Sequence, residues 1–234
     1  NNNQLGLEKY LTMEGMTYRI SYTSNKDVTY GINYDKMKKN LTQSSSGKII
    51  YNPSDYENIL SSDDGVYRYT NLNDSSIFFN DNIERLVQNY RIGFIRLAQF
   101  DIERDNYSEA EKMIDQMNEY FPPSTLSIEP GIALLISDSI YGRTGNNVKQ
   151  LETLRDLFTS TLAIETEIYL LHKLSELDDI DFVKERAYEL LVNRSHYLNF
   201  ELEKYIGDIL SDYLEPYDFI EYCNSIFEKE YVIG

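Results

Sequence analysis

The fold is decided by residues 81–122, which read DNIERLVQNYRIGFIRLAQFDIERDNYSEAEKMIDQMNEYFP. Asp81 is a residue type that caps helix N-termini. Beyond it, apolar residues recur at intervals of three or four up to about residue 104, which is typical of a helix with one broad apolar face. Those apolar positions are Ile83, Leu86, Val87, Tyr90, Ile92, Phe94, Ile95, Leu97, Ala98 and Ile102.

A second helix follows closely. Asp and Asn at 105–106 predict a turn, and apolar residues at helical spacing resume over 108–120. The two prolines at 122–123 end this helix, because proline cannot continue the hydrogen-bond ladder. The stretch therefore predicts an antiparallel helical hairpin.

Small residues stand where the two helices of this hairpin would touch. Ala98 and Ala110 let the helices approach closely, and Pro122 ends the unit, as in the helix–turn–helix unit of a tetratricopeptide repeat. For residues 83–122 we favour a tetratricopeptide-like hairpin.

Later units keep the helices and lose the repeat signature. Residues 131–160 have a fair turn, but Gln150 replaces the small residue of the second helix. For residues 160–234 a generic antiparallel helical array is an equally good interpretation. Further helices are expected over 128–141, 148–158, 162–176, 181–193, 197–214 and 217–231. The predicted fold class is mainly α, a tetratricopeptide-like superhelix of antiparallel hairpins over 81–234.

The first 80 residues have a different character, with short polar runs between weak secondary-structure signals. A short helix is expected over 4–14 and a strand over 16–23, where apolar and polar residues alternate. Weaker strands are expected over 28–33, 48–51 and 65–70. Strands this short predict a small mixed α/β segment that packs on the first hairpin instead of folding alone.

Composition and charge exclude several classes of protein. The 234 residues carry a net charge of −17, which argues against nucleic acid or an anionic membrane surface as the main partner. Residues 1–80 hold 8 basic and 9 acidic side chains, whereas the remaining residues hold 14 basic and 30 acidic ones. No apolar run is long enough for a membrane helix. The acidic field of the helical part favours basic or neutral partners.

The residue types that carry cofactor or metal chemistry are sparse. His172 and His196 lie far from any cysteine or second histidine at ligand spacing, and Cys223 is the single cysteine. The glycine motifs of nucleotide-binding loops are absent from the sequence. We therefore expect no cofactor, no metal and no nucleophilic catalysis from this chain.

Paired carboxylates keep one enzymatic hypothesis open. Candidates for a glycosidase-type pair are Asp178, Asp179 and Asp181, and also Glu201 and Glu203. Such a pair needs an apolar cleft that raises one pKa. The three aspartates instead precede a helix, where capping and the helix dipole explain them.

Tyrosine is abundant, with 21 tyrosines beside 10 phenylalanines and no tryptophan. Tyrosine offers a flat apolar face and a hydroxyl, a combination common on recognition surfaces. Packing half-buried on helices accounts for most of these tyrosines. If a recognition patch exists, we expect it on the concave side of the helical array and at its junction with residues 1–80. The sequence selects no binding residues within that region.

Several segments taken in order resemble one family. These are residues 14–20 (EGMTYRI), 33–37 (NYDKM), 89–98 (NYRIGFIRLA) and the hairpin segment 107–115. Their order and spacing over about residues 5–175 are similar to the soluble C-terminal part of the bacterial protein O-mannosyltransferase-like membrane glycosyltransferases, a domain of unknown function. The Ser-rich stretch 42–47 replaces an aromatic-rich segment of that family.

The resemblance implies a module on the extracytoplasmic, periplasmic face of a bacterial membrane, joined to a membrane part that transfers a sugar to protein. The catalytic acid of the family lies in that membrane part, so no catalytic residue carries over to this chain. The implied function is non-catalytic binding or positioning of an acceptor protein or partner subunit.

Two other hypotheses stay open. One is a stand-alone tetratricopeptide-like adaptor, which would be cytoplasmic. The other, in a different class, is a carbohydrate-active enzyme that uses the paired carboxylates named above.

Overall fold

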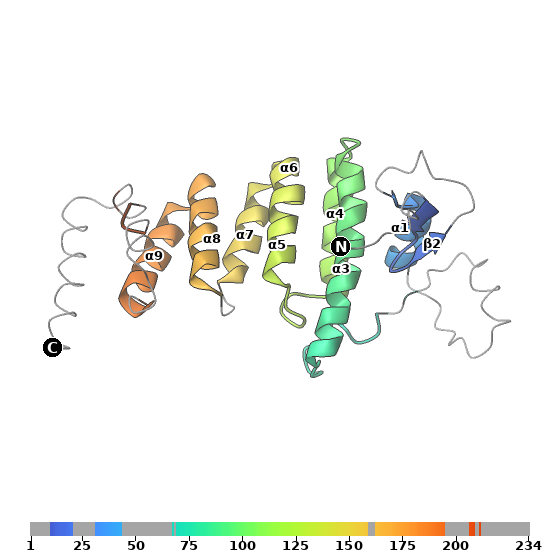
Figure 1. Cartoon of the computed structure of the whole chain (residues 1–234), viewed down its shortest axis with the longest axis horizontal. Helices are drawn as coiled ribbons and strands as arrows, with labels where there is room; N and C mark the ends of the chain where they lie inside the picture. Colours follow the sequence, from blue (N-terminus) through green and yellow to red (C-terminus); the bar gives the residue numbers. More distant parts are fainter. Residues whose placement is uncertain are drawn as a thin grey trace. The chain divides into compact units, whose positions relative to one another are not determined.

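A computed structural model describes residues 10–20, 31–43, 67, 69–158, 162–194, 206–208 and 211 (Figure 1). The described part is mainly helical, with one small two-stranded antiparallel sheet, which confirms the predicted class at that level. The chain divides into two compact units, residues 1–146 and residues 147–234, and each is described by itself. The compositional boundary expected at residue 80 stays a prediction.

The helical hairpin lies at the centre of the first unit. Helix α3 spans Asp81–Ile102, and its N-cap is Asn80, one residue before the cap expected from the sequence. The Asn80 side-chain oxygen accepts hydrogen bonds from the backbone amides of Asn82 and Ile83, both at 3.1 Å. These bonds satisfy two amides of the first turn, which have no partner within the helix. The turn follows at Asp105 (φ 59°), and α4 spans Tyr107–Tyr120.

The two helices bury a continuous apolar seam. Ala98 of α3 and Ala110 of α4 are both fully buried, as their proposed role at the crossing requires. Larger side chains fill the space around them, namely Phe94, Leu97, Ile114 and Met117, each 0% exposed. Small residues at the crossing and large ones beside it hold the hairpin closed.

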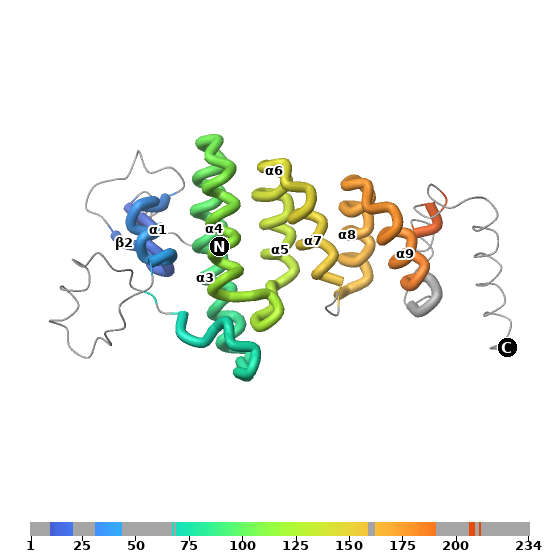
Figure 2. Tube along the Cα trace, turned by 180° about the vertical axis from the view of Figure 1, so that it is seen from behind, coloured from blue at the N-terminus to red at the C-terminus, as the bar shows by residue number. Residues whose placement is uncertain are grey.

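A third helical rod continues beyond the loop that ends at residue 129. Helix α5 spans Pro130–Ile136, a π-helical segment η3 spans Ser137–Tyr141, and α6 spans Gly142–Thr144. The helical rod thus extends beyond residue 141, where the sequence predicted its end. Residues 142–144 remain helical, and the rod ends at Gly145, where φ is 74°. Figure 2 shows α3, α4 and α5 side by side, with α5 running in the same direction as α3.

The N-terminal part forms a small hairpin of strands and one helix. Strand β1 (Leu11–Met13) pairs antiparallel with β2 (Tyr18–Ile20), with Leu11 opposite Ile20. The helix expected over 4–14 is wrong for the described residues 10–14, because backbone pairing with β2 and burial of Met13 outweigh local helix preference. Residues 18–20 confirm the central part of the strand expected over 16–23.

The strands expected over 28–33 and 65–70 are not formed by the residues described there. Ile32, within the strand expected over 28–33, makes a single parallel bridge with Met13. Tyr67, Tyr69 and Thr70 are not in a strand, and residues 48–51 lie outside the described part. Helix α1 (Tyr34–Thr42), which the sequence pattern does not predict, follows the bridge and starts at the cap Asn33.

Helix α1 packs directly on α3. Met37 and Leu41 are fully buried and belong to the same core as the hairpin. They lie against Gly93, where an added Cβ would come within 3.0 Å of the Leu41 Cδ1 atom. The absence of a side chain at residue 93 is thus what lets α1 approach α3.

Tyrosines complete this contact by satisfying the end of α1. The Tyr69 hydroxyl donates to the Leu41 carbonyl oxygen at 3.0 Å, and the Tyr120 hydroxyl donates to the Thr42 carbonyl oxygen at 2.8 Å. Carbonyls in the last turn of a helix have no partner within the helix. These two tyrosines therefore have a structural role. Tyr67, Tyr69, Tyr90, Phe94, Tyr120 and Phe121 form one aromatic cluster around this point.

The second unit is built from three described helices. These are α7 (Asn147–Leu157), α8 (Ile164–Glu176) and α9 (Ile180–Arg194), each within two residues of its predicted bounds. Of the helix expected over 197–214, the structure describes residues 206–208 and 211, all helical, and the helix expected over 217–231 lies outside the described residues. Within the described ranges, no helix combines the length and hydropathy needed to cross a bilayer.

Candidate functional site

The aspartates proposed as a catalytic pair lie at the start of α9. The Asp179 carboxylate, 7% exposed, accepts two hydrogen bonds from Arg155 at 2.7 and 2.5 Å. Asp178 and Asp181 are exposed, and Asp181 lies in the first turn of α9, where a negative charge stabilises the helix dipole. Asp181 thus fits the helix-dipole interpretation, and Asp179 makes an ion pair that the sequence pattern does not predict.

The other proposed side chains are dispersed. His172 is on an exposed face of α8, with its Nε2 3.5 Å from the Glu176 carboxylate one turn later. His196, Glu201, Glu203 and Cys223 lie outside the described residues. Across the described part of the chain, no group of three or more His, Cys, Asp or Glu side chains could hold a metal ion.

A polar network that the sequence does not reveal joins α1 to the turn of the α3–α4 hairpin. The Tyr34 hydroxyl donates to both oxygens of the Asp101 carboxylate, at 2.8 and 3.0 Å. Lys38 donates to the Tyr34 oxygen at 3.3 Å and to the Glu109 carboxylate at 2.6 Å. Tyr34 also stacks on Phe100, with 4.6 Å between ring centroids.

Burial and hydrogen bonds shift the pKa values of three side chains in this network. Burial raises the pKa of Asp101, and burial together with Asp101 raises the pKa of Tyr34 to about 12. Hydrogen bonds from Lys38 and Lys112 lower the pKa of Glu109. Because Asp101 is 3% exposed and its oxygens accept from Tyr34, we assign the network a role in joining α1 to the hairpin.

Two shallow depressions lie along α3 in the described part of the chain: the upper one between α3 and the η3–α6 segment, and the lower one between α3 and Glu129, the residue before α5. We call the surface that holds them the α3/α5 face. The lower depression, near the start of α3, has a volume of about 480 Å³. It is lined by Asn82, Arg85, Leu86, Gln88, Asn89 and Glu129. Both polar amides and charges of each sign therefore border it.

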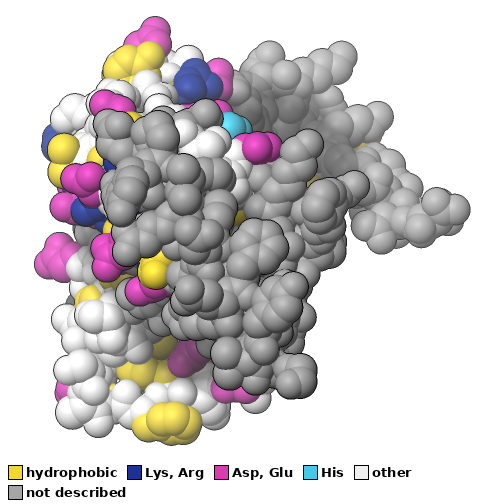
Figure 3. Space-filling view, turned by 90° about the vertical axis from the view of Figure 1, so that its left-hand side faces the viewer, with side chains coloured by type: hydrophobic (Ala, Val, Ile, Leu, Met, Phe, Trp, Pro, Cys, Tyr) yellow, Lys and Arg dark blue, Asp and Glu magenta, His cyan; other side chains and the backbone are white. Residues whose placement is uncertain are grey.

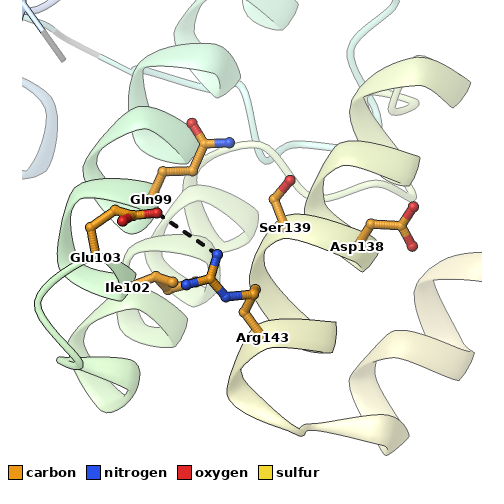
Figure 4. A pocket seen from close by; sticks show the side chains of 6 residues that line it. All are labelled: Gln99, Ile102, Glu103, Asp138, Ser139 and Arg143. Carbon is orange, nitrogen blue, oxygen red and sulfur yellow. Dashed lines mark ion pairs between the residues drawn. The ribbon is translucent and has the colours of Figure 1, made fainter.

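The upper depression, near the end of α3, has a volume of about 390 Å³. It is lined by Gln99, Ile102, Glu103, Asp138, Ser139 and Arg143 (Figure 4). The Arg143 guanidinium lies 3.8 Å from the Glu103 carboxylate, at the outer limit of an ion pair. In Figure 4, Gln99 and Glu103 face Ser139 and Arg143 across the depression, and Asp138 lies at its outer edge.

The π-helical segment shapes one wall of this upper depression. The Gly142 amide donates to the Ser137 carbonyl oxygen, a bond that spans five residues instead of four. The wider turn places Asp138 and Arg143, five residues apart, beside the same depression. Such π-helical turns are frequent at functional sites.

Apolar side chains are exposed where α3 begins. Phe78 is 89% exposed and Leu86 is 53% exposed, and Ile77 and Ile83 lie nearby in the sequence. In the face that Figure 3 shows, apolar and acidic side chains are interspersed over the coloured, left-hand part of the view.

Sequence reasoning did not select the residues of either depression. Gln99 and Glu103 are exposed or half-exposed positions on a helix recognised for its apolar face, and Ser139 and Arg143 come from a helix some 40 residues later. Only the packing of two parallel helices brings them together. In the sequence, the one hint of the upper depression is Gln99, a polar residue among the apolar residues of α3.

Comparison with models of known protein families, with curated proteins and with solved structures gave no match for this chain.

Proposed function

We propose that this chain is a non-catalytic interaction module that binds a polypeptide segment of a partner protein on the α3/α5 face. The observation that carries the proposal is the pair of open depressions along α3, on the side that faces Glu129 and the η3–α6 segment. Enzyme and cofactor sites bury most of a small ligand in one concave cavity. Two shallow depressions on one face suit separate side chains of an extended or helical segment.

The polar groups of the face fit the same use. Asn82 and Asn89 border the lower depression, and Gln99 borders the upper one. A side-chain amide carries both a donor and an acceptor, so it can pair with a peptide group of a bound backbone. Leu86, exposed between the two asparagines, offers an apolar contact beside them.

The finer description of the fold belongs to this proposal. We infer a tetratricopeptide-like superhelix, in which α3 and the α5–η3–α6 rod are the first helices of successive hairpins. The full burial of Ala98 and Ala110, on the two helices of the first hairpin, supports it. The π-helical segment is a departure from a regular repeat.

We also propose the cellular setting implied by the family resemblance, in which the module is extracytoplasmic and belongs to a membrane glycosyltransferase-like protein. Three of the resembling segments contact one another. Glu14 accepts from Lys36 at 3.2 Å, Arg96 donates to the Tyr18 hydroxyl at 2.8 Å, and Gly93 lies against Met37. Contact between the segments supports their being one structural unit, as a family motif would be.

The alternative is a stand-alone cytoplasmic adaptor that uses the same face without a membrane part. The full-length gene separates the two settings. A reading frame continuous with this chain and containing many hydrophobic spans supports the first setting, and a frame without them supports the second. A carbohydrate-active enzyme is less well supported, because the Asp179 carboxylate is bound by Arg155.

Selection from a phage-displayed dodecapeptide library tests the binding function. Selected peptides are labelled and their affinities measured by fluorescence anisotropy. The double variant Asn89→Ala/Gln99→Ala should weaken binding at least about tenfold, since it removes two side-chain amides. The matched control Ser108→Ala/Glu119→Ala changes two exposed positions of α4 and should bind as the unchanged chain does. Peptides equally affected by both variants, or no selected peptide at all, would contradict the proposal.

A further inference from the structure

Helix α1 contacts the α3–α4 hairpin through one stripe of its surface. Tyr34, Met37, Lys38 and Leu41 occupy positions i, i+3, i+4 and i+7, so all four side chains lie on the same face of the helix. A helix that docks on another protein presents its anchors at this spacing.

We propose that the surface that receives α1 is a helix-binding site, which α1 fills in cis and which a partner-protein helix with the same four anchors can occupy instead. We call it the α1-docking surface. Its contacts with the four anchors and with the end of α1 come from Gly93, Phe100, Asp101, Glu109, Gln116 and Tyr120. It is separate from the α3/α5 face, so this inference does not depend on the polypeptide binding proposed there.

The two apolar anchors fit a position at which α3 has no side chain. Met37 and Leu41 are both 0% exposed. An added Cβ at Gly93 would lie 3.0 Å from the Leu41 Cδ1 atom and 3.7 Å from the Met37 Cε atom. The backbone of α3 therefore leaves room for a large apolar side chain at positions i+3 and i+7 of the docked helix.

The two polar anchors meet carboxylates of the hairpin. The Tyr34 hydroxyl donates to both oxygens of Asp101, at 2.8 and 3.0 Å, and its ring stacks on Phe100. Lys38 donates to the Glu109 carboxylate at 2.6 Å. Asp101 is 3% exposed, so a docked helix without a donor at position i would leave this buried carboxylate short of a partner. The surface thus selects an aromatic hydroxyl at i and a cation at i+4.

The α1-docking surface also recognises the end of a helix. The Tyr120 hydroxyl and the Gln116 amide donate to the Thr42 carbonyl oxygen, at 2.8 and 3.1 Å. The Tyr69 hydroxyl donates to the Leu41 carbonyl oxygen at 3.0 Å. The last carbonyls of a helix have no partner within the helix, so these donors set where a docked helix ends. Since the start of α1 contacts the end of α3, the docked helix runs antiparallel to α3.

Helix α1 depends on this surface more than the hairpin depends on α1. It has nine residues, of which Met37 and Leu41 are buried. Isolated helices shorter than about 12–15 residues are marginal in water, so α1 is helical because it is docked. On its opposite side, Lys36 and Asn40 contact Glu14 of the β1–β2 turn, at 3.2 and 2.6 Å. We therefore expect α1 to undock while α3 and α4, which share their own apolar seam, stay folded.

Amide hydrogen exchange of the unchanged chain tests whether α1 is separable. The opening equilibrium constant of the amides of residues 37–42 should exceed that of residues 94–98 at least about a hundredfold. Leu41→Ser should open α1 further and leave the amides of α3 and α4 protected. Asp35→Ser changes an exposed residue of the same helix and should alter neither.

Two results of this experiment would overturn the inference. One is equal opening constants for α1 and α3 in the unchanged chain. The other is loss of protection in α3 and α4 on Leu41→Ser, because α1 would then be an integral part of the hairpin core.

Binding in trans is measured by fluorescence anisotropy with a labelled peptide of residues 31–43. The peptide should bind the Leu41→Ser chain at least about tenfold more tightly than the unchanged chain, in which the intact α1 competes from within the molecule. The same peptide with Met37→Ser and Leu41→Ser is the control and should bind neither chain. No binding to the Leu41→Ser chain, or equal binding of the two peptides, would overturn the inference.

A second peptide tests the four anchors themselves. It keeps the four anchor residues, and alanine replaces the other residues between positions 34 and 42. It should bind the Leu41→Ser chain within about fivefold of the first peptide, since alanine favours the helix while the contacts with Glu14 are lost. Tyr34→Phe in this peptide should weaken binding about three- to tenfold, because Asp101 loses a donor. Binding of the first peptide alone would contradict recognition by the four anchors.

Light scattering separates a partner helix from a second copy of this chain. We expect the unchanged chain to show no dimer that Leu41→Ser abolishes. Such a dimer would identify the occupant as α1 of another copy and would overturn the proposal of a partner helix.

Discussion

The guanidinium of Arg91, in the middle of α3, donates at 2.9 Å to the carbonyl oxygen of Phe121, the C-cap residue that follows α4. Arg91 is 0% exposed, and it also donates to the carbonyls of Leu126 and Ser127 in the loop that leads to α5. Burial lowers its pKa to about 10, so the group is still cationic near neutral pH. Backbone carbonyls, with Gln88, thus solvate a buried charge, and the loop between α4 and α5 is fixed to α3 by it.

Replacing Arg91 should loosen that loop. In Arg91→Lys a single ammonium group cannot reach all three carbonyls, and groups left buried without partners cost free energy. We expect the free energy of unfolding of the first unit to fall by about 2–4 kcal/mol. The control is Arg85→Lys, because Arg85 is exposed and bonds one asparagine at 3.1 Å; it should change stability by less than about 0.5 kcal/mol. Hydrogen exchange at residues 121–129 gives the measurement, and equal protection in the two variants would argue against the assigned role.

Two glycines offer substitutions with opposite expected signs. Alanine favours a helix by about 1 kcal/mol over glycine. At Gly93 the new Cβ would lie 3.0 Å from Leu41 and 3.7 Å from Met37, so Gly93→Ala should destabilise the first unit by about 1–3 kcal/mol through overpacking.

At Gly131, in α5, an added Cβ meets nothing within 4 Å. Gly131→Ala should therefore stabilise the same unit by about 0.5–1 kcal/mol. Urea unfolding monitored by amide exchange compares the two variants. A stabilised Gly93→Ala variant would show that α1 does not press against α3 as described.

The contrast between α3 and α1 shows what the sequence could predict. Helix α3 is long and has a broad apolar face, so its periodicity alone predicts its ends to within about two residues. Helix α1 has nine residues, three of them lysines, and buries only Met37 and Leu41. Two apolar residues four positions apart do not distinguish a helix from a loop. The helix forms because both side chains pack against Gly93 of α3, a contact that the local sequence of α1 does not reveal.

The candidate site could not be predicted for a related reason. Glu103 and Arg143 are 40 residues apart in the sequence, and they meet because α3 and the α5–η3–α6 rod run parallel. The π-helical turn that places Asp138 and Arg143 at the border of one depression has no sequence signature of the kind that capping residues or prolines provide. The Asp178–Asp181 group shows both sides: local sequence rules predict the helix start, whereas the ion pair of Asp179 with Arg155, 24 residues away, has no local signature.

The network at Asp101 predicts a pH dependence of stability. Burial raises the pKa of this carboxyl in the folded chain above its unfolded value of about 3.9. The folded state therefore binds the proton more tightly, and the contribution of Asp101 to stability is largest below about pH 3.9 and is lost as the pH rises through the folded pKa.

Asp101→Asn should abolish that loss. As the pH rises from about 4 to the raised pKa of folded Asp101, the unchanged chain should lose stability relative to the variant. Above that pKa the difference in unfolding free energy between the two should stay constant. Tyr34→Phe removes a donor to the carboxylate, at 2.8 Å, and should make the loss larger. A pH-independent difference for Asp101→Asn would contradict the assignment, and chemical shifts of the Asp101 carboxyl carbon would report its titration directly.

Neighbouring aspartates before α9 should respond oppositely to substitution. Asp179→Asn keeps the size of the side chain but removes the charge that Arg155 contacts through two nitrogens. We expect the second unit to lose about 1–2 kcal/mol, a modest amount because Arg155 is 47% exposed and partly solvated.

Asp178 has φ 63°, in the left-handed region that costs a non-glycine residue about 1–2 kcal/mol. Glycine adopts this conformation without strain, but it loses more conformational entropy on folding than aspartate does. The net effect of Asp178→Gly on the same unit should therefore lie between no change and a stabilisation of about 1 kcal/mol. Amide exchange in α7, α8 and α9 measures both variants, with α3 and α4 as internal references that neither should alter. If Asp178→Gly destabilised the second unit as much as Asp179→Asn, the Asp178 carboxylate would be making a contact of its own, and the paired-carboxylate hypothesis would regain a candidate.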